Sequence, residues 1–305
     1  MIESAASFVA QMLRISVPYA LAATGGALSE RGGVINIALE GMLLAGAFGA
    51  AAGTLATGNP WLGLLLGAAA GLLLASLHAA VTVGAKADQI LSGLALNLLA
   101  FGATRGLLKV LYGSSSNSPR FESIPPLPLP MPEQFTSLAE VLGSPLFLGA
   151  VVLVTLAQGL LGGTGFGLAL RAAGDGPRAL DGAGLSVAGM RWAGVLLSGA
   201  FGGLAGAWLA LEQHNFTDGM SGGRGYIALA AMIVGKWRPA AGAFACLLFG
   251  AAETLQMRVP ASVLPTQFLQ MLPYVVTLIA LAGWIGRSAP PQALGEPYDR
   301  EGGRA

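Results

Sequence analysis

Long apolar stretches separated by shorter polar ones are the main feature of this 305-residue sequence. Several windows contain few or no charged side chains over about 20 residues, the length that a helix needs to cross the hydrocarbon core of a bilayer. The pattern predicts an all-α, polytopic transmembrane helical bundle in residues 1–286. About nine spans are expected, at approximately residues 5–28, 37–57, 60–84, 88–112, 144–163, 191–211, 224–236, 239–256 and 268–286.

The polar connections between these segments differ in character. Residues 113–143 contain the run SIPPLPLPMP, which predicts an ordered or semi-rigid loop outside the bilayer. Residues 164–190 carry charges of both signs, whereas the proline- and glycine-rich tail 287–305 is expected to be disordered. The segment 224–236 is short for a span, which favours a broken helix beside a cavity.

Composition supports a membrane protein, because 54% of the residues are hydrophobic and only 10% are charged, against about 25% in ordinary soluble domains. Lys and Arg are usually enriched on the cytoplasmic side of a membrane. If residues 164–190 are cytoplasmic, most basic residues lie inside, which places the N-terminus outside and the C-terminus inside. The net charge of +1 points to no nucleic-acid partner.

Glycines at intervals of four residues recur along the predicted spans, as in Gly67/Gly71 and Gly199/Gly203. Small residues at this spacing allow helix backbones to approach closely within lipid. The stretches LAGAFGAAAG (44–53) and LSGAFGGLAG (197–206) resemble each other, and we attribute the similarity to a shared packing requirement rather than to a duplication.

The sequence offers no nucleotide site and no evident catalytic group. A phosphate-binding loop of the G-x-x-x-x-G-K-[ST] type would need a hydroxyl after the lysine, but Gly235 and Lys236 are followed by Trp237. Two histidines are too few for a metal cluster. We therefore expect no enzyme activity and no cofactor in this chain.

Polar side chains within the apolar segments are candidates for a translocation path or gate, because such groups are costly in lipid and usually face a bundle interior or a cavity. For Glu40, favourable interaction with the N-terminus of its own helix is an alternative. For Asn97, an interhelical hydrogen bond and a substrate contact both remain open. The candidates are Asn36, Glu40, Asn97, Thr104, Glu253 and Gln256.

The stretch LRAAGDGPRALDGAGLSV (170–187) predicts a short helix on the cytoplasmic side. Pro177 suits its first turn, and Gly182 or Gly184 suits its end. A charged helix in a chain without an ATP site favours a surface that receives force from another subunit, and a solvated loop is the alternative. Its candidate coupling residues are Arg171, Asp175, Pro177, Arg178 and Asp181.

Four stretches resemble the permease subunits of ABC importers in the branched-chain-amino-acid/ribose superfamily, over approximately residues 10–285. They are SERGGVINIALEGMLLAGAFGA, QILSGLALNLLAFG, LRAAGDGPRALDGAGLSV and GRGYIALAAMIVGKWRP. Within this superfamily the chain is most similar to the nucleoside/simple-sugar branch. It lacks the additional N-terminal span and the Asp-containing motif of the ribose branch, with VINIALEG in place of that motif, and this difference favours nucleosides.

The resemblance implies a multi-pass subunit in a bacterial plasma (inner) membrane that imports nucleosides by alternating access. It implies three protein partners: a second homologous permease subunit, an ABC ATPase that binds ATP and Mg²⁺, and an extracytoplasmic substrate-binding lipoprotein. It also implies that residues 170–187 form the coupling loop and that membrane lipid surrounds the bundle. Simple sugars or branched-chain amino acids are alternative substrates, and a secondary transporter or channel is an alternative of another class.

Overall fold

The computed structural model describes residues 2–259, 268, 271, 275, 279 and 289–299. Within this part the chain is helical, and its one isolated β-bridge joins Asn117 and Thr217. The elements are α1 (Ile2–Arg31), α2 (Leu39–Thr57), α3 (Pro60–Ala79), the π-helical turn η1 (Ala80–Gly84), α4 (Gln89–Tyr112), the 3-10 turn η2 (Glu133–Phe135), α5 (Thr136–Leu142), α6 (Pro145–Gly163), α7 (Gly165–Asp175), α8 (Pro177–Gly182), α9 (Val187–Gln213), α10 (Arg224–Val234) and α11 (Pro239–Arg258).

Seven helices of the described residues are long and apolar enough to cross a membrane, which confirms the predicted class of fold. They are α1, α2, α3 together with η1, α4, α6, α9 and α11. The predicted span 224–236 corresponds to α10, which has 11 residues and is too short to be counted with the seven. The predicted span 268–286 lies outside the described residues except at positions 268, 271, 275 and 279.

Local sequence explains where these helices begin. Asn59 caps α3 by accepting the backbone N–H of Trp61 at 2.9 Å, and Pro60 takes the first helical position, where no N–H is needed. Asp88 caps α4 in the same way, through the N–H groups of Ile90 and Leu91. These caps satisfy backbone groups that a helix leaves unpaired at its end.

The centre of the bundle is built by backbone contact between α2, α3 and α9. A Cβ added to Gly46 would meet the backbone of Gly203, and one added to Gly71 would meet the carbonyl of Gly199. The two similar ten-residue stretches lie in α2 and α9 and include this contact, as expected for a shared packing requirement. Gly102 and Gly106 of α4 differ, because a Cβ at either position would have no neighbour within 4 Å.

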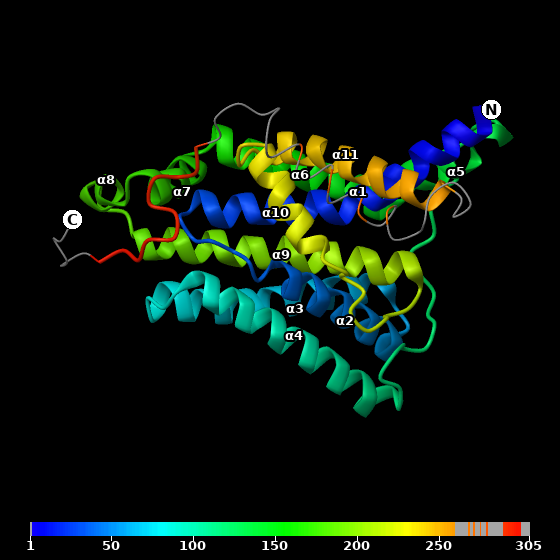
Figure 1. Cartoon of the computed structure of the whole chain (residues 1–305), viewed down its shortest axis with the longest axis horizontal. Coiled ribbons are helices and arrows are strands. Elements are labelled where there is room, and N and C mark those ends of the chain that lie inside the picture. Colours follow the sequence, from blue (N-terminus) through cyan, green and yellow to red (C-terminus); the bar gives the residue numbers. More distant parts are fainter. Residues whose placement is uncertain are drawn as a thin grey trace.

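The two ends of the bundle carry different loops (Figure 1). The start of α1 and the short helix α5 lie at one end, whereas α7, α8 and residues 289–299 lie at the other. At the first end, the beginning of the 113–143 loop pairs with the chain after α9, and the N–H of Phe121 donates to His214 O at 3.0 Å. The first part of this loop is thus held against the chain that follows α9.

The expectation of a disordered tail is wrong for residues 289–299. The N–H of Ala293 donates to Gly174 O at 2.8 Å, and the N–H of Gly295 donates to Gly33 O at 3.1 Å. The Arg191 guanidinium donates to Glu296 O at 2.6 Å. Polar composition predicted disorder, but this segment is held by backbone groups at the ends of other elements, which its own composition does not reveal.

Candidate functional site

The N-termini of α2 and α10 meet inside the bundle at the carboxylate of Glu40. Residues 33–38 leave the end of α1 without forming a helix, and α2 then starts part-way along the bundle (Figure 1). Glu40 is 1% exposed and accepts the backbone N–H groups of Gly223 at 2.8 Å and Gly225 at 2.7 Å. We call this contact the Glu40 junction.

Helix electrostatics explain why a carboxylate occupies this position. The first N–H groups of a helix have no partner within the helix and carry partial positive charge. Glu40 lies in the first turn of α2, and no side chain at the preceding position caps α10, so the Glu40 carboxylate caps α10 while it lies at the N-terminus of its own helix. A Cβ at Gly225 would lie 2.5 Å from the Glu40 nitrogen, so this close approach requires glycine.

Asn97 joins α4 to the Glu40 junction with every polar atom of its side chain. Its Oδ1 accepts the N–H of Gly41 at 2.8 Å. Its Nδ2 donates to Ile37 O at 3.0 Å and to the Tyr226 hydroxyl at 3.1 Å. Asn97 is buried, whereas Tyr226 is 45% exposed. Asn97 therefore makes an interhelical contact, and Tyr226 is the part of this network that reaches the surface.

Asn36 lies in the non-helical segment that leads to the junction. It is fully buried, and its Nδ2 donates to the Ser198 hydroxyl of α9 at 2.8 Å. Among the described residues its Oδ1 has no hydrogen-bond partner. Asn36 therefore fixes the segment against α9.

Glu253 contacts the beginning of α10 through Arg224. The Arg224 guanidinium lies 3.0 Å from Glu253 Oε1, and the Tyr19 hydroxyl of α1 donates to the other carboxylate oxygen. The Thr104 hydroxyl instead donates to Ala100 O of its own helix at 2.7 Å, and Gln256 is half-buried about one turn beyond Glu253. The structure thus brings Glu40 and Asn97 together, connects Glu253 through Arg224, and leaves Thr104 outside the network.

Sequence reasoning missed two members of this site. Tyr226 is a single aromatic residue in an apolar segment, so its spacing gave no signal. The Arg224 side chain is only 21% exposed and is paired with Glu253. The unusual position of an arginine just after three turn-forming residues, Ser221 to Gly223, was the available signal.

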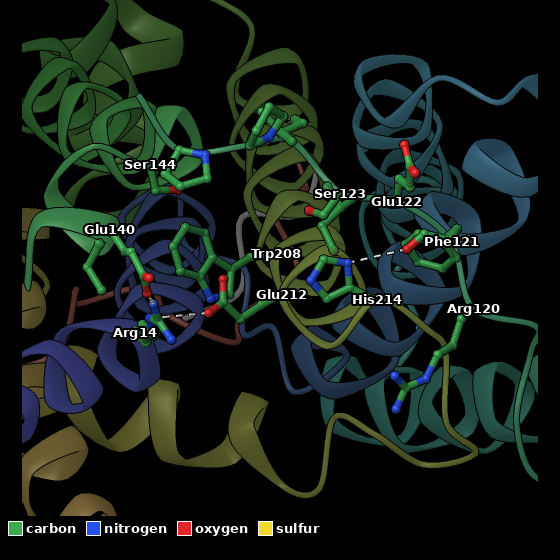
Figure 2. Close-up of a pocket in the computed structure, with 15 residues that line it drawn as sticks. Arg14, Arg120, Phe121, Glu122, Ser123, Glu140, Ser144, Trp208, Glu212 and His214 are labelled. Carbon is green, nitrogen blue, oxygen red and sulfur yellow. Dashed lines mark hydrogen bonds and ion pairs between the residues drawn. The ribbon is translucent and has the colours of Figure 1, made fainter. Parts of the chain in front are cut away.

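A second polar site lies beneath the 113–143 loop, and we call it the loop pocket. It has a volume of about 980 Å³. Figure 2 shows the Arg14 guanidinium between two carboxylates, with Trp208 beside them; the distances are 2.9 Å to Glu140 and 3.3 Å to Glu212. The His214 ring lies 3.3 Å from Phe121 O at the other side of the pocket. Arg14 thus joins α1, α5 and α9 at this end of the bundle.

The opposite end carries the candidate coupling residues. A helix begins at Pro177 and ends at Gly182, as predicted, and a second helix, α7, precedes it. Asp175 and Arg178 are exposed, while the Arg171 guanidinium donates to Gly167 O within α7 at 3.3 Å. The Tyr298 hydroxyl donates to Asp181 at 3.2 Å. In the part of the chain that the structure describes, no group of three or more His, Cys, Asp or Glu side chains is arranged to hold a metal ion.

These features define an integral membrane protein with broken helices meeting inside the bundle, an arrangement typical of transporters. Residues 8–281 match the family described as branched-chain amino acid transport system / permease component. The chain belongs to this family and is a multi-pass permease component of the plasma membrane.

Named relatives cover nearly the whole chain. The nucleoside ABC transporter permease protein NupC of Lactococcus lactis is 41% identical over 95% of this chain and 96% of its own length. The guanosine ABC transporter permease protein NupQ of Bacillus subtilis is 38% identical over 93% of both chains. A protein of Haloferax volcanii that is provisionally named a glucose ABC transporter permease is 31% identical over 97% of this chain and 99% of its own.

Proposed function

We propose that this chain is the permease subunit of an ATP-driven nucleoside importer and that its Glu40 junction lies beside the substrate path. The observation that carries the proposal is the meeting of two helix N-termini at one buried carboxylate. Backbone that leaves helical geometry at membrane depth is tolerated where it is buried in protein or lines a cavity, and transporters use such breaks at their substrate sites. The two relatives that share 38% and 41% identity are named for guanosine and nucleosides, which supports the choice of substrate.

The path runs along the face between α4 and α10. Tyr226 is exposed on this face, and the half-exposed ring of Phe101 lies on α4 about one turn from Asn97. Arg105, 66% exposed, pairs with Asp218 at 3.7 Å. A guanidinium facing acyl chains is unfavourable, so this face suits a second permease subunit with an aqueous path between the two.

The two ends of the bundle receive different partners. We place α7 and α8 in the cytoplasm, where the ABC ATPase binds them and supplies the ATP and Mg²⁺ chemistry. The loop pocket then faces outward, with the N-terminus outside and the C-terminus inside. Its mixed charges, and a volume of about 980 Å³ that is large for a nucleoside, suit a side-chain contact from the substrate-binding lipoprotein.

Uptake measurements test this function. Cells that lack the subunit should lose ATP-dependent uptake of labelled nucleosides and keep ribose uptake. The wild-type gene should restore nucleoside uptake. Asn97→Leu should fail to restore uptake because it removes the hydrogen bonds to Gly41, Ile37 and Tyr226. Thr104→Val is the matched control, since its hydroxyl bonds only within α4. Loss of sugar uptake with nucleoside uptake intact would instead assign the chain to sugars.

A further inference from the structure

The segment 289–299, which we call the C-terminal strap, holds the C-terminal end of α7. The N–H of Ala293 donates to Gly174 O at 2.8 Å. The Arg191 guanidinium approaches Ala173 O at 3.5 Å and donates to Glu296 O of the strap at 2.6 Å. The last carbonyl groups of a helix have no partner within the helix and carry partial negative charge, so an N–H and a guanidinium suit them.

The same strap contacts the segment that leads to the Glu40 junction. The N–H of Gly295 donates to Gly33 O at 3.1 Å, in the turn that follows α1. Hydrogen bonds also hold the residues that follow: the N–H of Ile35 donates to Gln89 Oε1 at 2.7 Å, and Asn36 Nδ2 donates to Ser198 Oγ at 2.8 Å. Hydrogen bonds therefore lead from the end of α7 through the strap to Gly33, and from there the covalent chain continues through the segment 33–38 to Glu40.

The far end of the strap reaches α8 and the turn after α3. The Tyr298 hydroxyl donates to Asp181 of α8 at 3.2 Å. Asp299 lies 3.1 Å from the Lys86 ammonium, just beyond η1. The strap thus contacts α7 and the approach to α2 through its backbone, and α8 and Lys86 through the side chains of Tyr298 and Asp299.

The burial of Arg191 indicates that the contact between the strap and α7 does more than stabilise the fold. It is 3% exposed, and its Nε has no hydrogen-bond partner among the described residues. Burying a guanidinium with an unpaired donor is unfavourable, and apolar packing would stabilise a static contact better. A guanidinium that contacts both the end of α7 and the strap is better suited to holding these two segments together while they move.

We propose that the C-terminal strap transmits the motion of α7 and α8 to the Glu40 junction, with Arg191 and Tyr298 as positioning residues. The proposal rests on the proposed function in one respect, that a partner ATPase binds α7 and α8. When the ATPase moves these helices, the strap shifts Gly33 and so alters the segment 33–38 that positions Glu40. The strap is therefore a coupling element of this subunit, separate from the helices that the ATPase contacts.

Gly295 offers a variant that disturbs the strap without changing a spanning helix. It has φ +83°, and a Cβ there would lie 2.9 Å from Ile35 Cδ1, so Gly295→Val should shift the strap from the 33–38 segment. Gly58→Val is the matched control, because Gly58 has φ +68° and a Cβ there would meet nothing within 4 Å. A chain ending at residue 288 removes the strap entirely, and Tyr298→Phe removes only the hydroxyl that bonds Asp181.

The test uses the full transporter complex in proteoliposomes, with nucleoside uptake and ATP hydrolysis measured together. Gly295→Val and the truncated chain should keep complex assembly and ATP hydrolysis but lower uptake per ATP by about tenfold, a size typical of coupling between sites. Tyr298→Phe should also lower uptake per ATP, and Gly58→Val, which carries similar backbone strain away from the strap, should keep the wild-type uptake per ATP. Unchanged uptake per ATP in both strap variants would overturn the proposal, as would a parallel fall in assembly, hydrolysis and uptake.

Hydrogen exchange provides a readout that does not depend on the substrate. In the wild-type complex, ATP binding should change amide exchange in residues 33–40 and 223–225. The Gly295→Val complex should lose this change while keeping the change in α7 and α8. If the exchange pattern holds but no nucleoside is transported by the wild type, the assigned substrate is wrong and the strap proposal stands. An ATP-dependent change at residues 33–40 that persists in Gly295→Val would refute the strap proposal.

Discussion

Replacing Glu40 by glutamine tests whether one carboxylate holds two helices together. The carboxylate accepts two N–H groups, at 2.8 and 2.7 Å, and is almost fully buried. A carboxamide has one acceptor oxygen, so one N–H would face an NH₂ donor instead. The N–H left without an acceptor costs about 1–3 kcal/mol, and the other N–H exchanges a charged acceptor for a neutral one, which costs about 1 kcal/mol. With a weaker interaction at the helix N-termini, Glu40→Gln should lower the free energy of unfolding by about 3–5 kcal/mol.

The measurement is thermal and denaturant unfolding of the purified protein in detergent, alongside uptake in cells. Glu140→Gln is the matched control, because its carboxylate is 50% exposed and pairs with Arg14. Exposed ion pairs contribute about 0–1 kcal/mol, so this variant should unfold nearly as the wild type does. Equal stability of the Glu40 and Glu140 variants would refute the reasoning that the junction depends on a carboxylate.

Three further changes have definite expected outcomes. Gly225→Ala should prevent α10 from packing against Glu40 and should lower both the yield of folded protein and uptake. Gly102→Ala, which has open space around it, should be neutral or slightly stabilising in unfolding assays. Equal behaviour of the two variants would contradict the packing argument. Arg178→Glu on the exposed face of α8 should leave the protein folded but abolish uptake and weaken co-purification of the ATPase, and normal uptake would remove α8 from the mechanism. In whole cells a cysteine at the exposed position Ser116 should react with an impermeant thiol reagent and one at Ala179 should not, while the reverse would overturn the orientation.

The length of the apolar stretches was enough to predict most of the fold. Apolar length marks each long span, and Pro177 marks where α8 begins because proline suits the first turn of a helix. The site was only partly predictable. Glu40 and Asn97 stood out as polar groups in apolar segments, but their partners lie far away in sequence, at Gly225 and Tyr226, and no local pattern connects them.

The segment 289–299 is a second case in which the contacts could not be predicted from the local sequence. Its composition describes only its own residues, whereas its order depends on free carbonyl groups at Gly33 and Gly174. A segment with few apolar side chains is expected to stay unfolded unless other elements offer it hydrogen-bond partners. Such partners become visible only when the three-dimensional arrangement is known.

The glycine contacts between α2, α3 and α9 also restrict how this protein can evolve and move. At Gly46, Gly71 and Gly203 the neighbouring backbone fills the place of a side chain, so these positions have no side chain to re-pack when neighbouring helices shift. Two helices in such contact cannot slide past each other without separating, and the three act mechanically as one block. The shape changes of a transport cycle must then fall outside this block, on the segment 33–38 and on α10 and α4, whose contacts with the block include the hydrogen bonds of Glu40 and Asn97. Sequence variation among relatives should follow the same division, with few substitutions in the block and more in the surrounding helices.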